Sequence, residues 1–296
     1  VLFQSTAFWS IPFDSIPFHK QYVTHIMADT TNNISDKKLR LTIRICKDNM
    51  AFSVGDPQES GQLVYEPYHM NAGISIAANL REAFHVSELL QSGYKRVLIE
   101  LDAPVMLVPT DEYAGQDIEA LYHHTYHQNG SEEILSSVLP DLNAVAVFSI
   151  NKDLKLVIDD HFQDIRIQPL MQSVWTHCYR RSFSGTRRKL YAYFHEKQLE
   201  VFCFQQNRFR FSNSFVTTHA HDILYYLLYI WKLTGMEAEK DELYLLGSMP
   251  HEDWLTTQIK QHLQYCRVIS PEADFNNNSI AKQKNIPYDM KAIYLD

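Results

Sequence analysis

The histidine pair His219 and His221, followed by Asp222, has a spacing that could hold a metal ion. On a strand, side chains two residues apart lie on the same face, so both rings could reach one zinc ion. A hydrolase built on such a pair needs further ligands, and none is evident at the expected position. The other interpretation is that Thr217 or Thr218 caps a helix whose first turn contains Asp222, where a carboxylate is favourable. We favour the helix and expect no metal here.

A second group of histidines has helical spacing. His123 and His127 are four residues apart, which places both rings on one face of a helix. That geometry suits zinc, but no third ligand is evident nearby. We interpret this segment as the exposed, histidine-rich end of a helix and expect no metal site.

Two short turns contain the side chains that could contact an anion. Lys47, Asp48 and Asn49 join two strands of one hairpin, and residues 196–198 (Glu-Lys-Gln) join the strands of another. Loops that hold phosphate bring backbone amides close to the ligand, and this approach usually requires glycine. Neither turn contains glycine, and each contains a carboxylate.

Those turns belong to two similar runs of predicted elements. Alternating apolar residues predict a hairpin over residues 41–54, and two similar apolar runs around a turn predict a second hairpin over residues 190–203. Each hairpin is followed by a third strand (62–68, 208–215), a helix (73–92, 219–234) and another strand (95–101, 243–246). The offset of roughly 150 residues is too long for a solenoid repeat and indicates two similar α/β halves. A ligand would lie in the cleft between such halves.

Further elements continue each half. Gly93 and Gly235 are expected to end the two long helices. The remaining predicted helices are 111–127, 153–161, 169–180 and 250–265, and the remaining strands are 105–108, 144–150, 165–167 and 267–270. Residues 182–189 form a polar, charged connection between the halves.

The composition excludes several classes of protein. The net charge of -8 argues against a general nucleic-acid binder, and only 9 glycines argue against a phosphate-loop enzyme. The 4 cysteines are scattered without a close pair, so we expect reduced thiols and a cytoplasmic protein. No apolar stretch is long enough to span a membrane.

Residues 1–26 differ in character from the rest of the chain. They contain a near-duplication, Ser-Ile-Pro-Phe, and lack the features of a signal peptide. From Met27 the sequence resembles an ordinary polar start. We expect Met27 to be the initiator.

The order of elements resembles the actin-like ATPase superfamily, and more closely an uncharacterised family of Bacteroidetes proteins assigned to it. The resemblance supports the fold far more than the function. The stretches that carry it are 41–54, 97–109, 144–150, 209–215, 222–228 and 244–247.

The resemblance also implies where nucleotide would bind. The first phosphate turn of the superfamily reads Asp-x-Gly-Thr; here Cys46 takes the Asp position and Asp48 the Gly position. The second turn, 195–198, again lacks glycine. Gly247 and Ser248 correspond to half of the usual Gly-Gly pair of the adenosine loop, although a simple strand-to-helix connection explains them as well.

We therefore expect an actin-like, ribonuclease H-like α/β fold of two lobes, each with a mixed sheet and flanking helices. Lobes at 39–182 and 183–275 would follow an N-terminal extension and precede a tail at 276–296. The expected function is that of a non-catalytic scaffold that binds an unknown protein partner, without nucleic acid, cofactor or membrane span.

Two alternatives stay open. The first is a divergent ATP-binding protein, in which Asp48, Asn49, Lys197, Gly247 and Ser248 would contact ATP-Mg in the cleft. The second is a metal-dependent hydrolase.

Overall fold

The computed structural model describes residues 39–56, 62–115, 117–126, 130–183, 185–206 and 208–295. Met27 and His127 lie outside these residues. Residues Leu39–Asp296 form one compact unit. Its strands form two five-stranded sheets and one three-stranded sheet within the described part of the chain.

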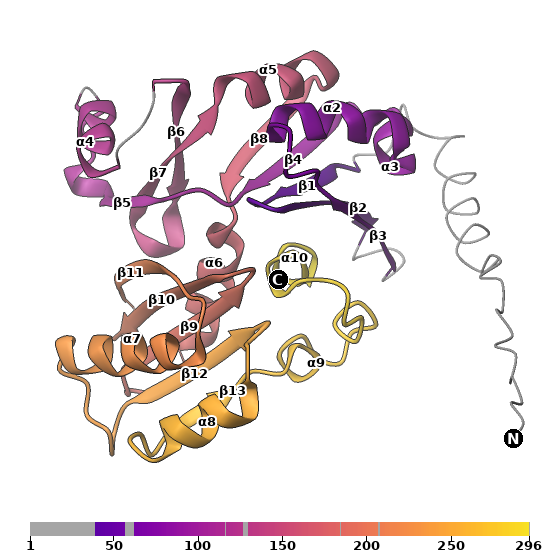
Figure 1. Cartoon of the computed structure of the whole chain (residues 1–296). Helices are drawn as coiled ribbons and strands as arrows, with labels where there is room; N and C mark the ends of the chain where they lie inside the picture. Colours follow the sequence, from indigo (N-terminus) through magenta and orange to yellow (C-terminus); the bar gives the residue numbers. More distant parts are fainter. Residues whose placement is uncertain are drawn as a thin grey trace, which may run out of the picture. The chain divides into compact units, whose positions relative to one another are not determined.

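The first five-stranded sheet has the order β3-β2-β1-β4-β8. The first three strands form an antiparallel meander, and β4 and β8 run parallel to β1 and to each other. In Figure 1, the helices α2, α3 and α5 lie along one side of this sheet. The strands are β1 (Leu41–Ile45), β2 (Asn49–Asp56), β3 (Gln62–His69), β4 (Arg96–Leu101) and β8 (Asp164–Pro169). The helices are α2 (Ile76–Val86), α3 (Glu88–Gln91) and α5 (Lys152–His161).

The second sheet repeats this arrangement, with the order β11-β10-β9-β12-β13. Here β9, β10 and β11 form the meander, and β12 and β13 are parallel to β9. The shared strand order is what the two similar runs of elements in the sequence predict. The strands are β9 (Lys189–His195), β10 (Gln198–Gln205), β11 (Arg208–Val216), β12 (Glu242–Gly247) and β13 (Cys266–Val268).

Strand β9 shows why the second sheet is buried on both faces. Leu190, Ala192 and Phe194 pack into one apolar cluster, against α7 (Ala220–Leu233) and α8 (Glu252–Lys260). Tyr191 and Tyr193 point to the opposite face and pack with α6 (Met171–Ser182). Successive side chains of a strand alternate between faces, so an apolar run without polar interruption indicates two covered faces.

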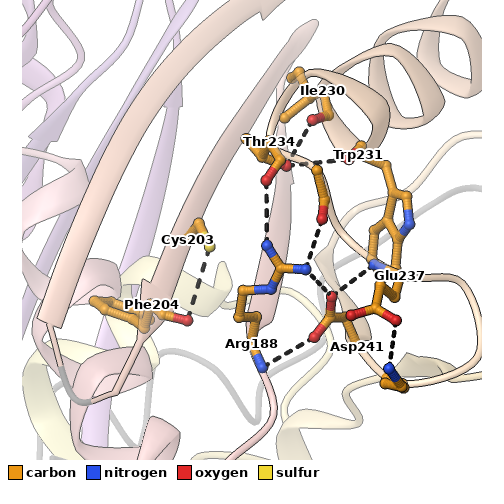
Figure 2. Close-up of polar contacts among 10 residues, drawn as sticks. Arg188, Cys203, Phe204, Ile230, Trp231, Thr234, Glu237 and Asp241 are labelled. Atoms are coloured by element: carbon orange, nitrogen blue, oxygen red, sulfur yellow. Dashed lines mark hydrogen bonds and ion pairs between the residues drawn. The ribbon is translucent and has the colours of Figure 1, made fainter.

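A network around Arg188 fastens the end of α7 to the start of β9 (Figure 2). Its guanidinium donates to Thr234 O at 3.2 Å, Gly235 O at 2.7 Å and Asp241 Oδ2 at 2.7 Å. The same carboxylate oxygen accepts from the backbone of Glu237 at 2.7 Å. Gly235 has a φ of 63°, as expected for a glycine that ends a helix.

The third sheet, β5-β7-β6, differs from the expectation. β6 (Glu132–Leu139) was not predicted, because its Glu and Ser residues hide the apolar alternation of a half-exposed edge strand. The helix expected over 111–127 is shorter: α4 spans Ile118–Thr125, and a single 3-10 turn, η1, spans Thr110–Glu112. The other strands are β5 (Met106–Pro109) and β7 (Ala144–Asn151), and η2 (Pro140–Leu142) joins β6 to β7.

The C-terminal segment contains a helix that the sequence did not predict. After the short α9 (Pro271–Asp274), residues 275–287 form turns and loops, and α10 spans Tyr288–Leu295. Within α10, Met290 is fully buried, and Ala292 is 3% exposed. The tail is therefore part of the core.

Among the described residues, no helix is both long and apolar enough to cross a membrane.

Candidate functional site

The site centres on Arg44, a charged residue in the otherwise apolar strand β1. Its side chain is 3% exposed. Nε donates to Asp289 Oδ2 at 2.9 Å, and Nη2 lies 2.8 Å from the same oxygen. Burial alone would lower the pKa of Arg44, but the Asp289 carboxylate outweighs it and the pKa lies well above its ordinary value. α10 thus contributes a fully buried carboxylate to a cation in the first sheet.

Arg44 also joins the two hairpin turns at which the resemblance leads us to expect phosphate loops. Its Nη1 donates to Asn49 Oδ1 at 3.3 Å in the first turn and to Glu196 Oε1 at 3.3 Å in the second. The first turn is closed by Cys46 N, which donates to Asn49 O at 2.9 Å. One guanidinium therefore contacts both turns and the C-terminal helix.

Glu100 lies on β4 directly beside Arg44, since the two residues are paired in the register of β1 and β4. Its Oε1 accepts from Gln168 at 2.9 Å and Ser173 at 3.1 Å, whereas Oε2 has no hydrogen-bond partner. Complete burial raises the pKa of Glu100 well above its ordinary value. The neutral form of this carboxyl group is thereby favoured beside the Arg44–Asp289 pair.

The predicted nucleotide contacts do not surround one cavity. Gly247 and Ser248 line a cavity of about 400 Å³, together with Glu196. Asp48 and Lys197 are exposed and line neither this cavity nor a second one of about 550 Å³. Asn49 is engaged by Arg44. Whether any of these residues contacts nucleotide stays a prediction.

Gly247 has a structural reason to be glycine. Its φ is +91°, and a Cβ at this position would lie 2.2 Å from Phe194 O and 2.7 Å from the ring of Tyr193. Ser248 N donates to the same Phe194 oxygen at 2.8 Å. The close approach of β12 to β9 therefore requires glycine here, independently of any ligand.

The cavity beside Gly247 is lined with cations from the C-terminal segment. Lys282, Lys284 and Lys291 all line it. Lys291 is 4% exposed, and burial lowers the pKa of its ammonium group. The sequence did not indicate a role for these lysines, because no pattern in the tail predicts that it packs beside this cavity.

The structure describes His123, His219 and His221 but not His127. Among the described residues, no cluster of three or more His, Cys, Asp or Glu side chains could hold a metal ion. His221 packs against the ring of Trp254, with centroids 4.6 Å apart. Asp222 lies in the first turn of α7 as expected, but His219, not a threonine, is the N-cap. His123 lies 3.8 Å from Glu119 on α4.

The two central residues, Arg44 and Asp289, were not predicted from the sequence. The signal for Arg44 was a charge inside a strand whose other residues are apolar or Thr, since such a residue needs a buried partner. Nothing local pointed to Asp289, which is 245 positions away.

Comparison with known proteins identifies the family of this chain. The sequence profile of the family described as "Protein of unknown function (DUF3822)" matches residues 28–266. The chain belongs to this family. No curated protein matches the chain. The resemblance to an uncharacterised family is thus confirmed.

Solved structures show the fold of this DUF3822 member. A Bacteroides thetaiotaomicron protein "with actin-like ATPase fold and unknown function" is 25% identical, with a TM-score of 0.77, covering 88% of this chain and 97% of that chain. A second, the "PilM-PilN type IV pilus biogenesis complex", is 10% identical with a TM-score of 0.60, covering 86% and 97%. The predicted actin-like ATPase fold is confirmed.

Proposed function

We propose that this protein is a non-catalytic interaction protein that uses the actin-like fold without ATP turnover. The observation that carries the proposal is the buried Arg44, whose guanidinium contacts Asp289 and Glu196. These contacts join the two turns where the superfamily holds phosphates.

Electrostatics supports this proposal. Phosphoryl transfer relies on groups that position the phosphates and neutralise their charge. Here Asp48 and Glu196 lie in the two turns, and Asp289 already neutralises Arg44. No glycine lets backbone amides approach a phosphate closely at either turn. A polyphosphate at this position would meet a carboxylate in each turn, beside Lys47 in the first turn and Lys197 in the second, and no glycine-supported backbone amides.

A protein partner is the second part of the proposal. One solved structure of the same fold is a complex of two pilus-biogenesis proteins, PilM and PilN. That likeness concerns the fold alone, but it shows a fold of this kind in complex with another protein. The net charge of -8 makes a nucleic-acid partner unfavourable. A cytoplasmic location, supported by four scattered cysteines without a close pair in the sequence, belongs to the proposal as well.

One observation favours an alternative, namely a divergent nucleotide-binding protein. Lys282, Lys284 and Lys291 line the cavity next to Ser248, and the buried ammonium of Lys291 would gain from an anionic partner. In this alternative the tail, not the hairpin turns, would supply the phosphate contacts.

Two assays on the full chain test the proposed function. The first is phosphate release from ATP-Mg, for which we expect no rate above the protein-free background. The second is recovery of the tagged protein from its native host, followed by rebinding of the recovered partner as a purified protein. We expect one partner that rebinds at a fixed stoichiometry. ATP-dependent phosphate release that Lys291→Ala abolishes, in a variant that melts like wild type, would establish the enzymatic alternative.

A further inference from the structure

A second cavity, of about 550 Å³, lies at the carboxyl ends of β1 and β4. Its apolar wall includes Ile45, Leu101 and Met171, all nearly fully buried. Two carboxylates, Asp102 and Glu200, line the same cavity. The first follows β4, and the second lies on β10 of the other five-stranded sheet.

Neither carboxylate has a hydrogen-bond donor among the described residues. The Glu200 side chain is only 10% exposed, and its closest cationic partner is His195 Nε2 at 3.8 Å, beyond hydrogen-bond distance. Asp102 is held in place through its backbone, since its N donates to Ile45 O at 2.9 Å. Glu200 is buried and Asp102 is half-buried. Carboxylates in such positions without donors are costly, and most buried polar groups in folded proteins are satisfied.

His195 lies next to Glu200. Its side chain is 3% exposed, and neither Nδ1 nor Nε2 has a hydrogen-bond partner. The ring stacks on Tyr193 with centroids 5.1 Å apart, so packing fixes its position. His195 itself lines the other cavity, beside Gly247, so the two carboxylates and not the imidazole ring face the cavity of about 550 Å³.

The surroundings select the chemistry of a ligand. The exposed Lys47 also lines the cavity, but the two carboxylates leave its lining with a net negative charge that disfavours an anion. No described cluster of His, Cys, Asp or Glu has the geometry to hold a metal ion. Trp175 and Tyr126 also line the cavity, and aromatic faces attract organic cations. The apolar wall suits a short hydrocarbon stem.

We propose that this cavity binds an ammonium or guanidinium group on a short apolar stem, with Asp102 and Glu200 accepting its hydrogen bonds. The cation can come from a free small molecule or from a Lys or Arg side chain of a partner protein. Only the second source rests on the proposed function.

The experiment uses butylguanidine as the cationic probe and butylurea, its neutral counterpart of similar shape, as the control. Binding to the full chain is measured by calorimetric titration. We expect saturable binding of butylguanidine, and affinity for butylurea lower by about tenfold or more, because a charge-assisted hydrogen bond is lost. Equal affinity for both probes, or no saturable binding of butylguanidine, overturns the proposal.

Two variants of near-identical shape test the site residues. Asp102→Asn and Glu200→Gln should each weaken butylguanidine binding by about tenfold. Glu237→Gln, an exposed carboxylate on the loop after α7, is the matched control and should leave binding unchanged. Unchanged binding in both site variants contradicts the assignment. Melting curves establish whether each variant is folded. If a variant is unfolded, the comparison of butylguanidine with butylurea on the wild-type chain tests the proposal instead.

A peptide arm distinguishes the two sources of the cation. Acetyl-Leu-Arg-Leu-amide is compared with its citrulline version on the wild-type chain. Tighter binding of the arginine peptide than of butylguanidine supports a partner side chain, and tighter binding of butylguanidine supports a free small molecule. Failure of every cationic probe leaves the absence of ATP turnover, and hence the proposed function, untouched.

Discussion

At the scale of residues, the buried Arg44 determines which charges are available to a ligand near the two hairpin turns. A guanidinium on β1 would ordinarily be an attractive contact for a phosphate. Because Asp289 and Glu196 occupy its donors, the same group stabilises the protein instead. The positive charge of Arg44 is therefore paired within the folded protein.

Replacing Arg44 tests this role. Arg44→Met leaves Asp289 as a buried, unpaired carboxylate, so we expect a loss of about 3–5 kcal/mol in the free energy of unfolding. Urea denaturation measures the loss. The double variant Arg44→Met/Asp289→Leu should regain much of it, because no charge is left unpaired. Lys240→Ala, which breaks the exposed pair with Glu237, is the control and should leave stability unchanged.

Gly247 gives a second residue-scale prediction. Gly247→Ala places a Cβ 2.2 Å from Phe194 O at a φ of +91°, so strands β9 and β12 must shift apart. We expect a loss of about 3 kcal/mol or more. Gly93→Ala is the matched control: φ is +77°, but nothing lies within 4 Å of the added Cβ, so about 1 kcal/mol should be lost. Equal losses in the two variants would contradict the role assigned to the close approach.

At the scale of elements, the hairpins were predictable and the C-terminal helix was not. β1 and β2 alternate apolar and polar side chains, and β9 and β10 are short apolar, aromatic-rich runs on either side of a turn. Both patterns identify strands without tertiary information. α10 lacks a periodic pattern, because Asp289 and Lys291 are buried along with Met290. Its position depends on partners far away in the chain. For the same reason, the sequence predicted the two turns of the candidate site but neither Arg44 nor Asp289.

The C-terminal segment is fastened to α6 by a polar cluster whose contribution depends on pH. Asp274 Oδ2 accepts from Tyr288 at 2.5 Å and contacts His177 Nε2 at 2.7 Å. Burial acts to raise the pKa of Asp274, but the hydrogen bonds from His177 and Tyr288 outweigh it, and the pKa is lowered. A lowered pKa in the folded state stabilises the protein above the ordinary value of about 3.9, and this stabilisation is lost as the pH falls through the folded value.

Asp274→Asn tests this contribution. We expect a loss of about 1–3 kcal/mol at pH 7. The difference between wild type and variant should start to shrink as the pH falls below about 4, where the unfolded state takes up a proton, and should be smallest below the lowered folded-state pKa, where the carboxylate is protonated in both states. Urea denaturation over a pH series measures both. A difference that stays constant down to the acid range would show that the charge of Asp274 is irrelevant.

Packing of α10 gives a further prediction. Met290 is fully buried in a cluster with Leu63 of β3 and Ile286. Met290→Ala should cost about 2–5 kcal/mol, as for other deletions of large core side chains. Gln283→Ala, at a half-exposed position in the same tail, is the control. If Met290→Ala is as stable as wild type, the tail is not part of the core.

At the scale of the whole molecule, side-chain contacts connect the two five-stranded sheets and the C-terminal tail. Tyr294 of α10 donates to Thr42 of β1 at 2.9 Å and lies 2.9 Å from Ser53 Oγ of β2. Arg44 joins the first sheet to the second turn, and Tyr288 packs near α6. The proposed function would use this arrangement as a fixed surface for a partner, whereas nucleotide turnover needs opening and closing.

The melting temperature of the full chain with and without ATP-Mg tests the central claim most directly. A ligand that binds the folded state at a hundredfold excess over its dissociation constant stabilises it by about 2.7 kcal/mol, or roughly 5 °C or more for a chain of this size. We predict no change in melting temperature with ATP-Mg beyond that with magnesium alone. A saturable rise of that size, abolished by Lys291→Ala, would contradict the account and show that the cleft binds nucleotide.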